Sequence, residues 1–391
     1  MNFVTPASIA DYQRLARKRL ARIAFDYLEG GAEDGHTLRR NRQAFERLTF
    51  QSRVMCDVTS VDSAVTVLGR TLAMPAIVGP TGLNGLYMDR AEEVLAQAAH
   101  AAGLPFVMST ASTSLIEDVR AATSGDLWLQ LYVQQDRTIA EATIRRARES
   151  GFSVLMVTVD TPVHGVRDHD VRNNFKLPLR PSARLVVDVL QHPRWCLRML
   201  RQGGSPQLVN LARSLGESPN INKQAATMSR QMDTALDWSS IAWLRKQWPG
   251  PVVVKGILSV HDAAKAAAHG VDGIVLSNHG GRQLAYSPSP LEILPRVAES
   301  VGQKLVVMVD GGVRRGSDIV KARALGAQAV LLGRAPLYGL SATGRQGVDD
   351  VLTILRREFE ITLRLLGRCQ AAQLDTSVLD DNYLEHLARL D

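Results

Sequence analysis

The stretch from Ser277 to Leu284 (Ser-Asn-His-Gly-Gly-Arg-Gln-Leu) combines residue types that could carry out acid–base chemistry on a small anion. His279 is followed by two glycines, which leave room for a substrate, and then by Arg282. A neutral imidazole near pH 7 is a suitable base for proton abstraction. A guanidinium can bind a carboxylate through two parallel hydrogen bonds. We therefore interpret His279 as a candidate base and Arg282 as a candidate anchor for a carboxylate substrate.

Two later stretches could bind phosphate. The first runs from Asp310 to Gly316 and contains paired glycines and Arg314, and the second is Gly333-Arg334. Paired glycines let the backbone approach an anion closely, and the arginines supply positive charge. The alternative is a pair of turns with solvated arginines. We favour phosphate binding because both stretches follow apolar runs and the first enters a predicted helix, whose N-terminus attracts anions.

Lys255 and Asp160 each follow or end an apolar run. A buried lysine could form a Schiff base or act as a fixed cation, and the residue type does not separate the two. Asp160 could orient an imidazole and stabilise its protonated form. The alternative for Asp160 is a helix cap or a loop salt bridge.

Eight short runs rich in Val, Ile and Leu predict the strands that position these residues. Continuous apolar runs are typical of parallel strands that are buried on both faces. Helical patterns that end at a glycine lie between several of them, at residues 90–102, 138–150, 261–269 and 318–325. The predicted strands are residues 75–78, 105–108, 127–131, 154–157, 252–254, 273–276, 305–309 and 329–332.

This alternation predicts a (β/α)8 TIM barrel. Polar or glycine-containing positions follow every predicted strand, and in a barrel they would converge on the C-terminal face, where barrel enzymes place their active sites. The loops after the seventh and eighth strands form the usual phosphate site of such barrels. The positions concerned are Thr81, Ser109, Gln130, Tyr132, Thr158, Asp160, Lys255, Ser277, His279, Asp310 and Gly333-Arg334.

Two segments lie outside the repeat. Residues 1–70 form an N-terminal extension in which one amphipathic helix is expected to run to Leu28, and residues 176–250 separate the fourth and fifth strands. Residues 176–215 carry seven basic residues and a single acidic one, interleaved with apolar side chains. This pattern suits docking in a membrane interface. The alternative is a lid whose apolar side packs on the barrel. We expect residues 1–391 to form one domain that carries this segment.

Composition narrows the class of protein. Of 391 residues, 45% are hydrophobic and 22% are charged, which is ordinary for a globular chain with a sizeable core. The net charge of +7 favours anionic partners. We expect neither a metal nor a disulfide framework, because the three cysteines are far apart without a Cys-x-x-Cys pair. A secretory signal and a spanning segment are not expected either.

Together the motifs resemble those of the FMN-dependent 2-hydroxy acid oxidoreductases, from Tyr12 to about Gly367. The resemblance implies an FMN cofactor and the oxidation of a 2-hydroxy acid. It leaves two other classes as alternatives, a phosphate-binding barrel such as an isomerase or aldolase, and a basic module that binds nucleic acid. The chain shows no RNA-binding motif, so no nucleic-acid partner is expected.

The resemblance also implies a role for each matching residue. His279 would be the base, Asp160 would orient it, and Tyr132 would bind the substrate oxygen. Lys255 would be a cation beside the flavin rather than a Schiff base. The substrate carboxylate would be bound by Arg282, Arg167 and Tyr27. Flavin contacts would come from Pro80, Thr81, Gly82, Ser109, Gln130, Thr158 and Ser277, and ribityl and phosphate contacts from Asp310, Gly311, Gly312, Arg314, Gly333 and Arg334.

Within that family, residues 79–85, 192–195 and 228–233 resemble the mandelate-oxidising members. This implies oxidation of (S)-mandelate to benzoylformate, with electrons passed to a membrane quinone or a similar carrier. It further implies a peripheral protein on the cytoplasmic face of the inner membrane and a homotetramer. L-lactate or another 2-hydroxy acid of the same family is the alternative substrate.

Two single positions refine this expectation. Gly82 stands where the oxidases of the family commonly have Ala, which fits a dehydrogenase. Phe25 stands where many relatives have Tyr, but the matching functional residue, Tyr27, is intact. Because no haem domain precedes Tyr12, we do not expect a flavocytochrome.

Overall fold

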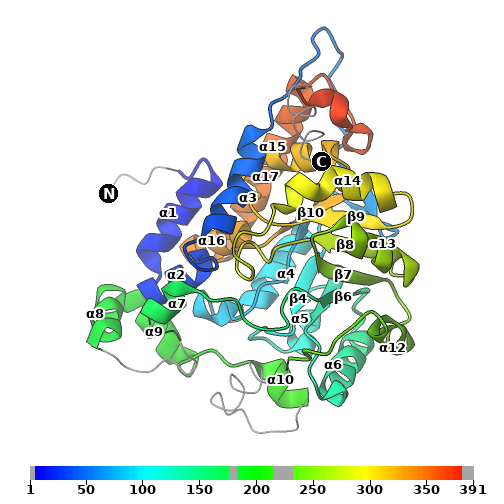
Figure 1. The fold of residues 1–391 in the computed structure, drawn as a ribbon. Coiled ribbons are helices and arrows are strands. Elements are labelled where there is room, and N and C mark those ends of the chain that lie inside the picture. The colour runs from blue at the N-terminus through cyan, green and yellow to red at the C-terminus, as the bar shows by residue number, and fades with distance from the viewer. Residues whose placement is uncertain (1–4, 174, 176–182, 215–231, 381–391) are drawn as a thin grey trace.

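The computed structural model describes residues 5–173, 175, 183–214 and 232–380. Within them, eight parallel strands close into a barrel in the order β10-β3-β4-β5-β6-β7-β8-β9, so the predicted (β/α)8 barrel is confirmed (Figure 1). The predicted residues 176–182, 215 and 228–231 lie outside the described part. The strands are β3 (Ala76–Val78), β4 (Phe106–Ser109), β5 (Leu127–Leu131), β6 (Val154–Thr158), β7 (Val252–Ile257), β8 (Gly273–Leu276), β9 (Val306–Val309) and β10 (Ala329–Leu332).

The apolar runs form strands because both faces of the sheet are covered. All five residues of β5 and all five of β6 are buried. Strand β10 pairs with β3 through Leu331 and Ile77, which closes the barrel. Parallel pairing aligns the strand ends, so that Ser109 lies opposite Gln130 and Thr158 lies opposite Lys255. The polar residues that follow the strands therefore meet at one face.

The four predicted helices between strands are confirmed, each within two residues at either end. The outer layer also contains helices that the patterns did not specify, among them α14, which begins at a capping box of Ser289 and Glu292. The helices around the barrel are α4 (Ala91–Ala101), α5 (Ile116–Ala122), α6 (Arg137–Glu149), α12 (Ser240–Gln247), α13 (Val260–Ala268), α14 (Pro290–Val301), α15 (Gly316–Ala324), α16 (Arg334–Thr343) and α17 (Arg345–Leu365).

The N-terminal extension differs from the single helix expected up to Leu28. Helix α1 (Ile9–Arg19) ends and α2 (Arg22–Glu29) begins across Leu20 and Ala21, whose ψ angles of 142° and 146° are extended. Both residues are buried, so packing against the molecule outweighs the helical pattern. Helix α3 (His36–Arg47) and a hairpin of β1 (Val65–Val67) and β2 (Arg70–Leu72) complete the extension.

Between β6 and β7, the described residues also form α7 (Asp168–Arg172), α8 (Ala183–Gln191), α9 (Pro193–Arg201) and α10 (Val209–Ser214). Figure 1 shows α8 and α9 beside α1 and α2, at the edge of the molecule, and the Ile23 amide donates to Asp188 Oδ2 over 3.4 Å. Helix α10 packs against α6 on the barrel itself. In the described part of the chain, no helix is both long and apolar enough to cross a membrane.

Candidate active site

A cavity opens at the C-terminal ends of the barrel strands and collects most of the residues singled out in the sequence. Asp160 and Ser277 do not line it but lie directly behind its wall. Of the residues singled out in the sequence, those that line it are Tyr27, Pro80, Thr81, Gly82, Ser109, Gln130, Tyr132, Thr158, Arg167, Lys255, His279, Arg282, Asp310, Gly311, Gly312, Arg314, Gly333 and Arg334.

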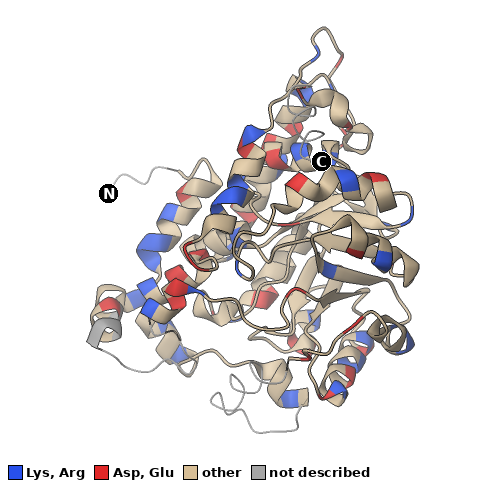
Figure 2. Ribbon diagram, viewed as in Figure 1, with Lys and Arg blue, Asp and Glu red and all other residues tan. Residues whose placement is uncertain are grey.

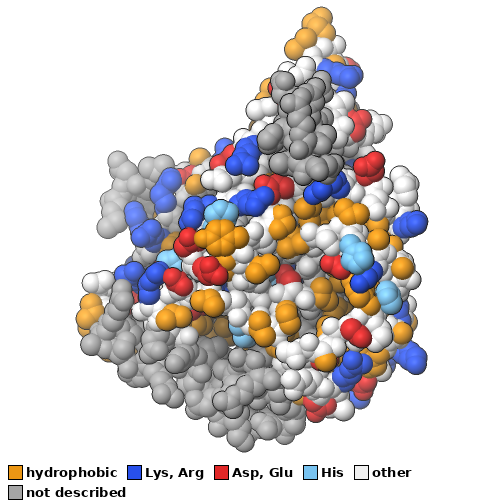
Figure 3. All heavy atoms as spheres, in the orientation of Figure 1, with side chains coloured by type: hydrophobic (Ala, Val, Ile, Leu, Met, Phe, Trp, Pro, Cys, Tyr) orange, Lys and Arg blue, Asp and Glu red, His pale blue; other side chains and the backbone are white. Residues whose placement is uncertain are grey.

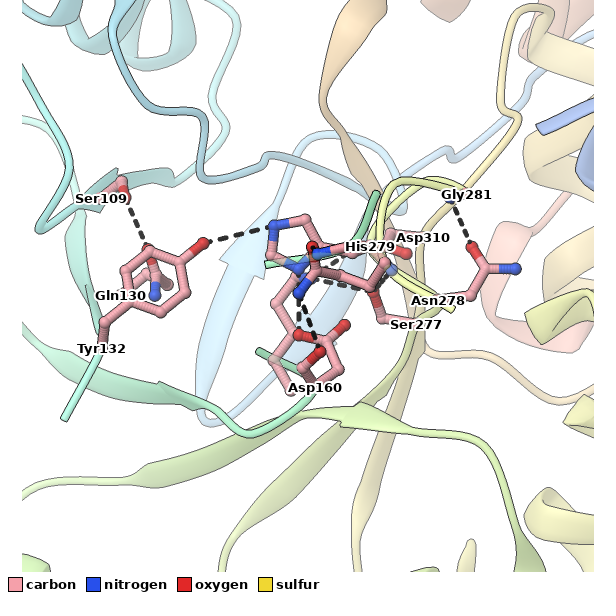
Figure 4. Close-up of polar contacts among 12 residues, drawn as sticks. Ser109, Gln130, Tyr132, Asp160, Ser277, Asn278, His279, Gly281 and Asp310 are labelled. Carbon is pink, nitrogen blue, oxygen red and sulfur yellow. Dashed lines mark hydrogen bonds and ion pairs between the residues drawn. The ribbon is translucent and has the colours of Figure 1, made fainter. Parts of the chain in front are cut away.

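The His279 imidazole is held between a carboxylate and a phenol (Figure 4). Its Nδ1 lies 2.9 Å from Asp160 Oδ1, and its Nε2 lies 3.3 Å from the Tyr132 hydroxyl. Burial would raise the pKa of Asp160, but the charges of His279 and Lys255 outweigh it, and the pKa is lowered. Asp160 is therefore ionised and accepts the Nδ1 proton, which leaves the lone pair on Nε2. Burial, followed by the charge of Asp160, raises the pKa of Tyr132, so its hydroxyl keeps its proton.

The backbone presents this imidazole in an unusual conformation. His279 has a φ of 58°, in the left-handed region that few residues other than glycine adopt. The Ser277 hydroxyl accepts the His279 amide at 3.0 Å, and the Asn278 side chain accepts the Gly281 amide at 3.0 Å. Asn278 is itself paired with Asn41 of α3 through two amide hydrogen bonds of 2.8 Å. The N-terminal extension thus supports the loop that carries the candidate base.

Gly256 makes room for Asp160. It lies at a register shift between β7 and β8, and its φ is 114°. A Cβ atom at this position would lie 2.7 Å from Asp160 Cβ and 2.9 Å from the Asp160 amide nitrogen. The residue next to Lys255 must therefore be a glycine for Asp160 to reach His279.

Lys255 is a fixed cation in the wall of the cavity. Its Nζ lies 3.1 Å from Asp310 Oδ2 and donates to Ser277 Oγ at 2.8 Å. Burial would lower its pKa, but the charges of Asp310 and Asp160 outweigh burial and raise the pKa. A lysine that stays protonated is a poor nucleophile, so this geometry disfavours the Schiff-base alternative. Ser277 is fully buried, with its hydroxyl engaged by Lys255 and the His279 amide.

Arg282 and Arg334 place positive charge in the cavity without a paired carboxylate in the described part of the chain. Arg282 donates to the Tyr27 and Gly30 carbonyls at 2.8 and 2.9 Å, and Arg334 donates to the Leu28, Gly280 and Gly30 carbonyls at 2.9 to 3.0 Å. Burial lowers the pKa of both groups, that of Arg334 to about 10, and each is lowered further by a neighbouring arginine. Two desolvated guanidinium groups held by neutral carbonyls favour the binding of anions.

A third arginine lies beside the Tyr27 ring. The Arg167 guanidinium carbon is 5.9 Å from the centre of that ring, and the Arg282 guanidinium carbon is 4.9 Å from it. The Nε of Arg167 is buried without a hydrogen-bond partner in the described residues, and its Nη1 lies 3.5 Å from Asp170 Oδ2. Tyr27, Arg167 and Arg282 thus surround one positively charged corner.

Part of the cavity wall was not anticipated from the sequence. Leu83, Ala111, Leu208 and Met232 line it and are buried. Leu208, which precedes α10, and Met232 both lie within residues 176–250, so both come from the insertion. His164, in the loop after β6, also lines the cavity. No periodic pattern or charged motif marks these positions, which explains why they were missed.

Comparisons with known proteins agree with this geometry. The profile of the FMN-dependent dehydrogenases matches residues 16–381. The chain belongs to the FMN-dependent dehydrogenase family. It is 45% identical over 384 residues to the (S)-mandelate dehydrogenase of Pseudomonas putida, covering 98% of this chain and 96% of that one. It is 37% identical over 373 residues to an L-lactate dehydrogenase of Pseudomonas syringae pv. syringae (strain B728a), covering 95% and 98%.

Solved structures lead to the same family. A crystal structure of the monotopic membrane protein (S)-mandelate dehydrogenase matches with a TM-score of 0.93 and 45% identity, covering 96% of this chain and all of that one. A mandelate oxidase variant with (S)-mandelic acid matches with a TM-score of 0.80 and 33% identity, covering 96% and 98%. The protein is an FMN-dependent 2-hydroxy acid dehydrogenase.

The residues around the cavity fit a flavin nucleotide. Gln130 Nε2, Thr158 Oγ1 and Asp310 Oδ1 are buried and lack a hydrogen-bond partner among the described residues, so a ligand with polar ring and chain atoms would satisfy them. Figure 4 shows Gln130 and Ser109 on neighbouring strands, with the Ser109 hydroxyl donating to Gln130 Oε1 at 2.6 Å. In the described part of the chain, no group of three or more His, Cys, Asp or Glu side chains could hold a metal ion.

Proposed function

We propose that this enzyme oxidises (S)-mandelate, or a similar aromatic (S)-2-hydroxy acid, to the 2-keto acid. The observation that carries the proposal is the position of an oriented imidazole close to Arg282, a guanidinium without a carboxylate partner among the described residues. A 2-hydroxy acid has a proton to give up next to a carboxylate, and the site offers a base next to cations. The (S)-mandelate dehydrogenase of Pseudomonas putida, at 45% identity, supports this substrate class.

In the proposed reaction, His279 Nε2 accepts a proton from the substrate. Asp160 holds the imidazole through Nδ1 and stabilises the imidazolium that forms. Tyr132, whose hydroxyl lies 3.3 Å from Nε2, donates a hydrogen bond to the substrate oxygen. Arg282, Arg167 and Tyr27 bind the carboxylate, which aligns the reacting carbon with the base.

The oxidation removes two electrons and two protons from the substrate, and bound FMN would take the electron pair together with the proton that His279 does not accept. We propose that Pro80, Thr81, Gly82, Ser109, Gln130 and Thr158 surround its ring system, with Lys255 as the neighbouring cation and Ser277 supporting Lys255. Arg314 and Arg334 would neutralise the phosphate, and the backbones of Gly311, Gly312 and Gly333 would approach it. The side chain of Asp310 would bind the ribityl chain through its unpaired Oδ1.

The apolar wall favours an aromatic substituent. Leu83, Ala111, Leu208 and Met232 would bury a phenyl ring, whereas the methyl group of lactate would leave part of the wall in contact with water. Relatives named L-lactate dehydrogenase at 37–39% identity make L-lactate the second candidate. Anaerobic titration of the flavin absorbance with each acid separates the two, and more complete reduction at lower concentration identifies the substrate.

Replacement of the base tests the reaction itself. We expect His279→Asn to bind FMN with an unchanged absorbance spectrum and to reduce it on the order of 10²- to 10⁴-fold more slowly, because a positioned general base contributes about that factor. Stopped-flow measurement of flavin reduction under anaerobic conditions gives the rate. A variant that reduces the flavin as fast as the wild type would remove His279 from this role.

We propose that the enzyme docks on the cytoplasmic face of the inner membrane through α8 and α9 and passes its electrons to a quinone or a similar carrier. Apolar side chains on these helices are exposed, with Leu190 at 74% and Leu200 at 69%. Figure 3 shows apolar side chains on the surface at the edge of the molecule where α8 lies. Lys and Arg residues of α1 and α9 lie around them (Figure 2). This combination suits an interface with anionic lipid headgroups. The solved relative described as a monotopic membrane protein supports the proposal.

A further inference from the structure

The side chain of Gln283 joins the two loops that carry the candidate catalytic groups. Gln283 follows Arg282 in the loop after β8, and its carboxamide reaches the loop after β6. Its Nε2 donates to the Asp160 carbonyl at 3.2 Å and to the Val163 carbonyl at 3.0 Å, and its Oε1 accepts the Gly165 amide at 3.2 Å. Three backbone groups of one loop are thus bound by one side chain.

The three partners require a carboxamide in this orientation. Two carbonyls need two N–H donors, and one amide needs one acceptor, which is the set of groups that Gln offers. A carboxylate of the same size would place negative charge against the carbonyls of Asp160 and Val163. A thioether of similar length, as in Met, would fill the volume but would make none of the three hydrogen bonds.

The bound loop positions two groups with different tasks. Asp160, at its start, holds Nδ1 of His279, and Arg167, two residues beyond Gly165, lies beside the Tyr27 ring. The loops also touch at Gly165, where a Cβ atom would lie 2.7 Å from the Arg282 carbonyl oxygen and still closer to that of Gln283. A shift of this loop would therefore move the Asp160 carboxylate and the Arg167 guanidinium together.

We propose that Gln283 is a positioning residue that aligns Asp160 with His279 and Arg167 with the substrate carboxylate. The inference rests on the proposed roles of these three residues. Gln283 acts on the rate through Asp160 and on substrate affinity through Arg167. A misplacement of about 1 Å can lower a rate about 10²-fold, so a side chain that only bonds the backbone can matter for catalysis.

A double-mutant cycle in the full-length enzyme with bound FMN tests the proposal. The variants are Gln283→Met, Asp160→Ala and the double variant, each assayed for anaerobic flavin reduction by whichever of (S)-mandelate and L-lactate reduces the wild type. We expect each single variant to lower the limiting rate about 10- to 100-fold. We expect Gln283→Met to lower the rate less than about 3-fold further in the Asp160→Ala background, because the two act through one contact. We also expect Gln283→Met to raise the KM for the substrate, because it displaces Arg167. This increase should be the same in the Asp160→Ala background, since Asp160 does not contact the substrate carboxylate.

Gly165→Ala provides a second, independent route to the same displacement. Its added methyl group pushes the two loops apart without removing any reactive or hydrogen-bonding side chain, so it should reproduce both the lower rate and the higher KM. Gln328→Met is the matched control. Gln328 Oε1 accepts the Val307 amide at 2.7 Å beside β9, so its loss should lower the melting temperature but keep wild-type rate and KM.

The outcomes separate the inference from the proposed function. If Asp160→Ala reduces the flavin at the wild-type rate, the proposed role of Asp160 has failed, and the inference falls with it. If Asp160→Ala is slow while Gln283→Met and Gly165→Ala are as fast as the wild type, only the positioning role of Gln283 is wrong. Losses that multiply in the double variant would also overturn it, because they would show that Gln283 and Asp160 act independently. A Gln328→Met variant with the same kinetic defect would overturn it as well, because the defect would then reflect a general loss of structure.

Discussion

The carboxylate of Asp160 links the candidate base to the stability of the fold. Its pKa is below the ordinary value, because the charges of His279 and Lys255 outweigh the effect of burial. A carboxylate with a lowered pKa stabilises the folded state above its unfolded pKa of about 3.9, and this stabilisation is lost as the pH falls through the folded value. Asp160 therefore contributes to stability at neutral pH and loses this contribution in acid.

We accordingly expect Asp160→Asn to lower the free energy of unfolding at about pH 7 and to differ less from the wild type below about pH 4. Urea unfolding at the two pH values, with the same FMN content in both proteins, measures the two differences. An equal difference at both pH values would mean that the ionisation of Asp160 contributes nothing to stability.

The guanidinium of Arg282 has a geometry that a lysine does not reproduce. Its Nη1 donates to the Tyr27 and Gly30 carbonyls, which fixes the plane of the group. An ammonium would keep the charge but lose the planar set of donors. We expect Arg282→Lys to raise the KM for the 2-hydroxy acid on the order of 10-fold or more, since a hydrogen bond to a charged group is worth about 1.5–3 kcal/mol. Steady-state kinetics provide the measurement, and an unchanged KM would exclude Arg282 as the anchor.

Sequence patterns anticipated the charged and polar residues of the cavity better than its apolar wall. His279, Arg282 and Lys255 follow strands, where a barrel must bring them together, and their residue types suggest chemistry. Leu208 and Met232 offer neither a periodic position nor a reactive group. Gln283 was part of a recognised motif, but its partners are backbone atoms of another loop, which no residue type reveals.

Helix α10 attaches the insertion to the barrel through Asn210. This buried side chain donates to Ser112 Oγ and to the Ser114 carbonyl, both at 2.8 Å, and accepts the Ile116 amide at 3.2 Å and Arg146 at 3.0 Å. Leu208, two residues earlier, lines the cavity. The attachment of α10 therefore bears on both stability and the shape of the apolar wall.

We expect Asn210→Ala to lower the free energy of unfolding by about 1–3 kcal/mol, because it leaves buried polar groups without partners. We also expect it to raise the KM for (S)-mandelate more than that for L-lactate, since only the aromatic ring needs the wall. Urea unfolding and kinetics with both acids test the two parts. Equal changes in KM would separate α10 from substrate selection.

Among the elements, the barrel strands were predicted closely and the N-terminal extension was not. Buried parallel strands show as continuous apolar runs, so their positions can be read from the local sequence alone. The break between α1 and α2 depends on Leu20 and Ala21 being buried in an extended conformation. That burial comes from neighbours distant in the sequence, which a helical pattern does not contain.

At the scale of the molecule, the insertion divides into an outward part and an inward part. Val186, Val187, Leu190, Leu197 and Leu200 are exposed on α8 and α9, whereas Trp195 and Met199 are buried. Trp195 Nε1 donates to the Leu86 carbonyl at 2.8 Å, so one side of α9 packs on the barrel as the lid alternative expected. Changes that test membrane docking should therefore be confined to the exposed side chains of α8 and α9.

We expect the double variant Leu190→Ser with Leu200→Ser to sediment less with vesicles containing anionic lipid and to reduce its flavin at the wild-type rate. Each exposed leucine would otherwise bury apolar surface worth about 1.5–3 kcal/mol in the bilayer. Leu365→Ser, on α17 and equally exposed at 71%, is the matched control. Sedimentation of the double variant equal to that of the control would argue against docking through α8 and α9.

The homotetramer stays a prediction, which light scattering in detergent can check.

Closure of the barrel by β10 and β3 also has a consequence for how the chain acquires its cofactor. Pairing Val330 with Ala76 joins strands from opposite ends of the barrel sequence, and contacts of such long sequence separation are slow to form. The loops after these two strands, at Pro80–Gly82 and Gly333–Arg334, line the same cavity. We therefore expect a refolding chain to lack a complete flavin pocket until β10 pairs with β3, so that the appearance of bound-flavin absorbance would report this pairing.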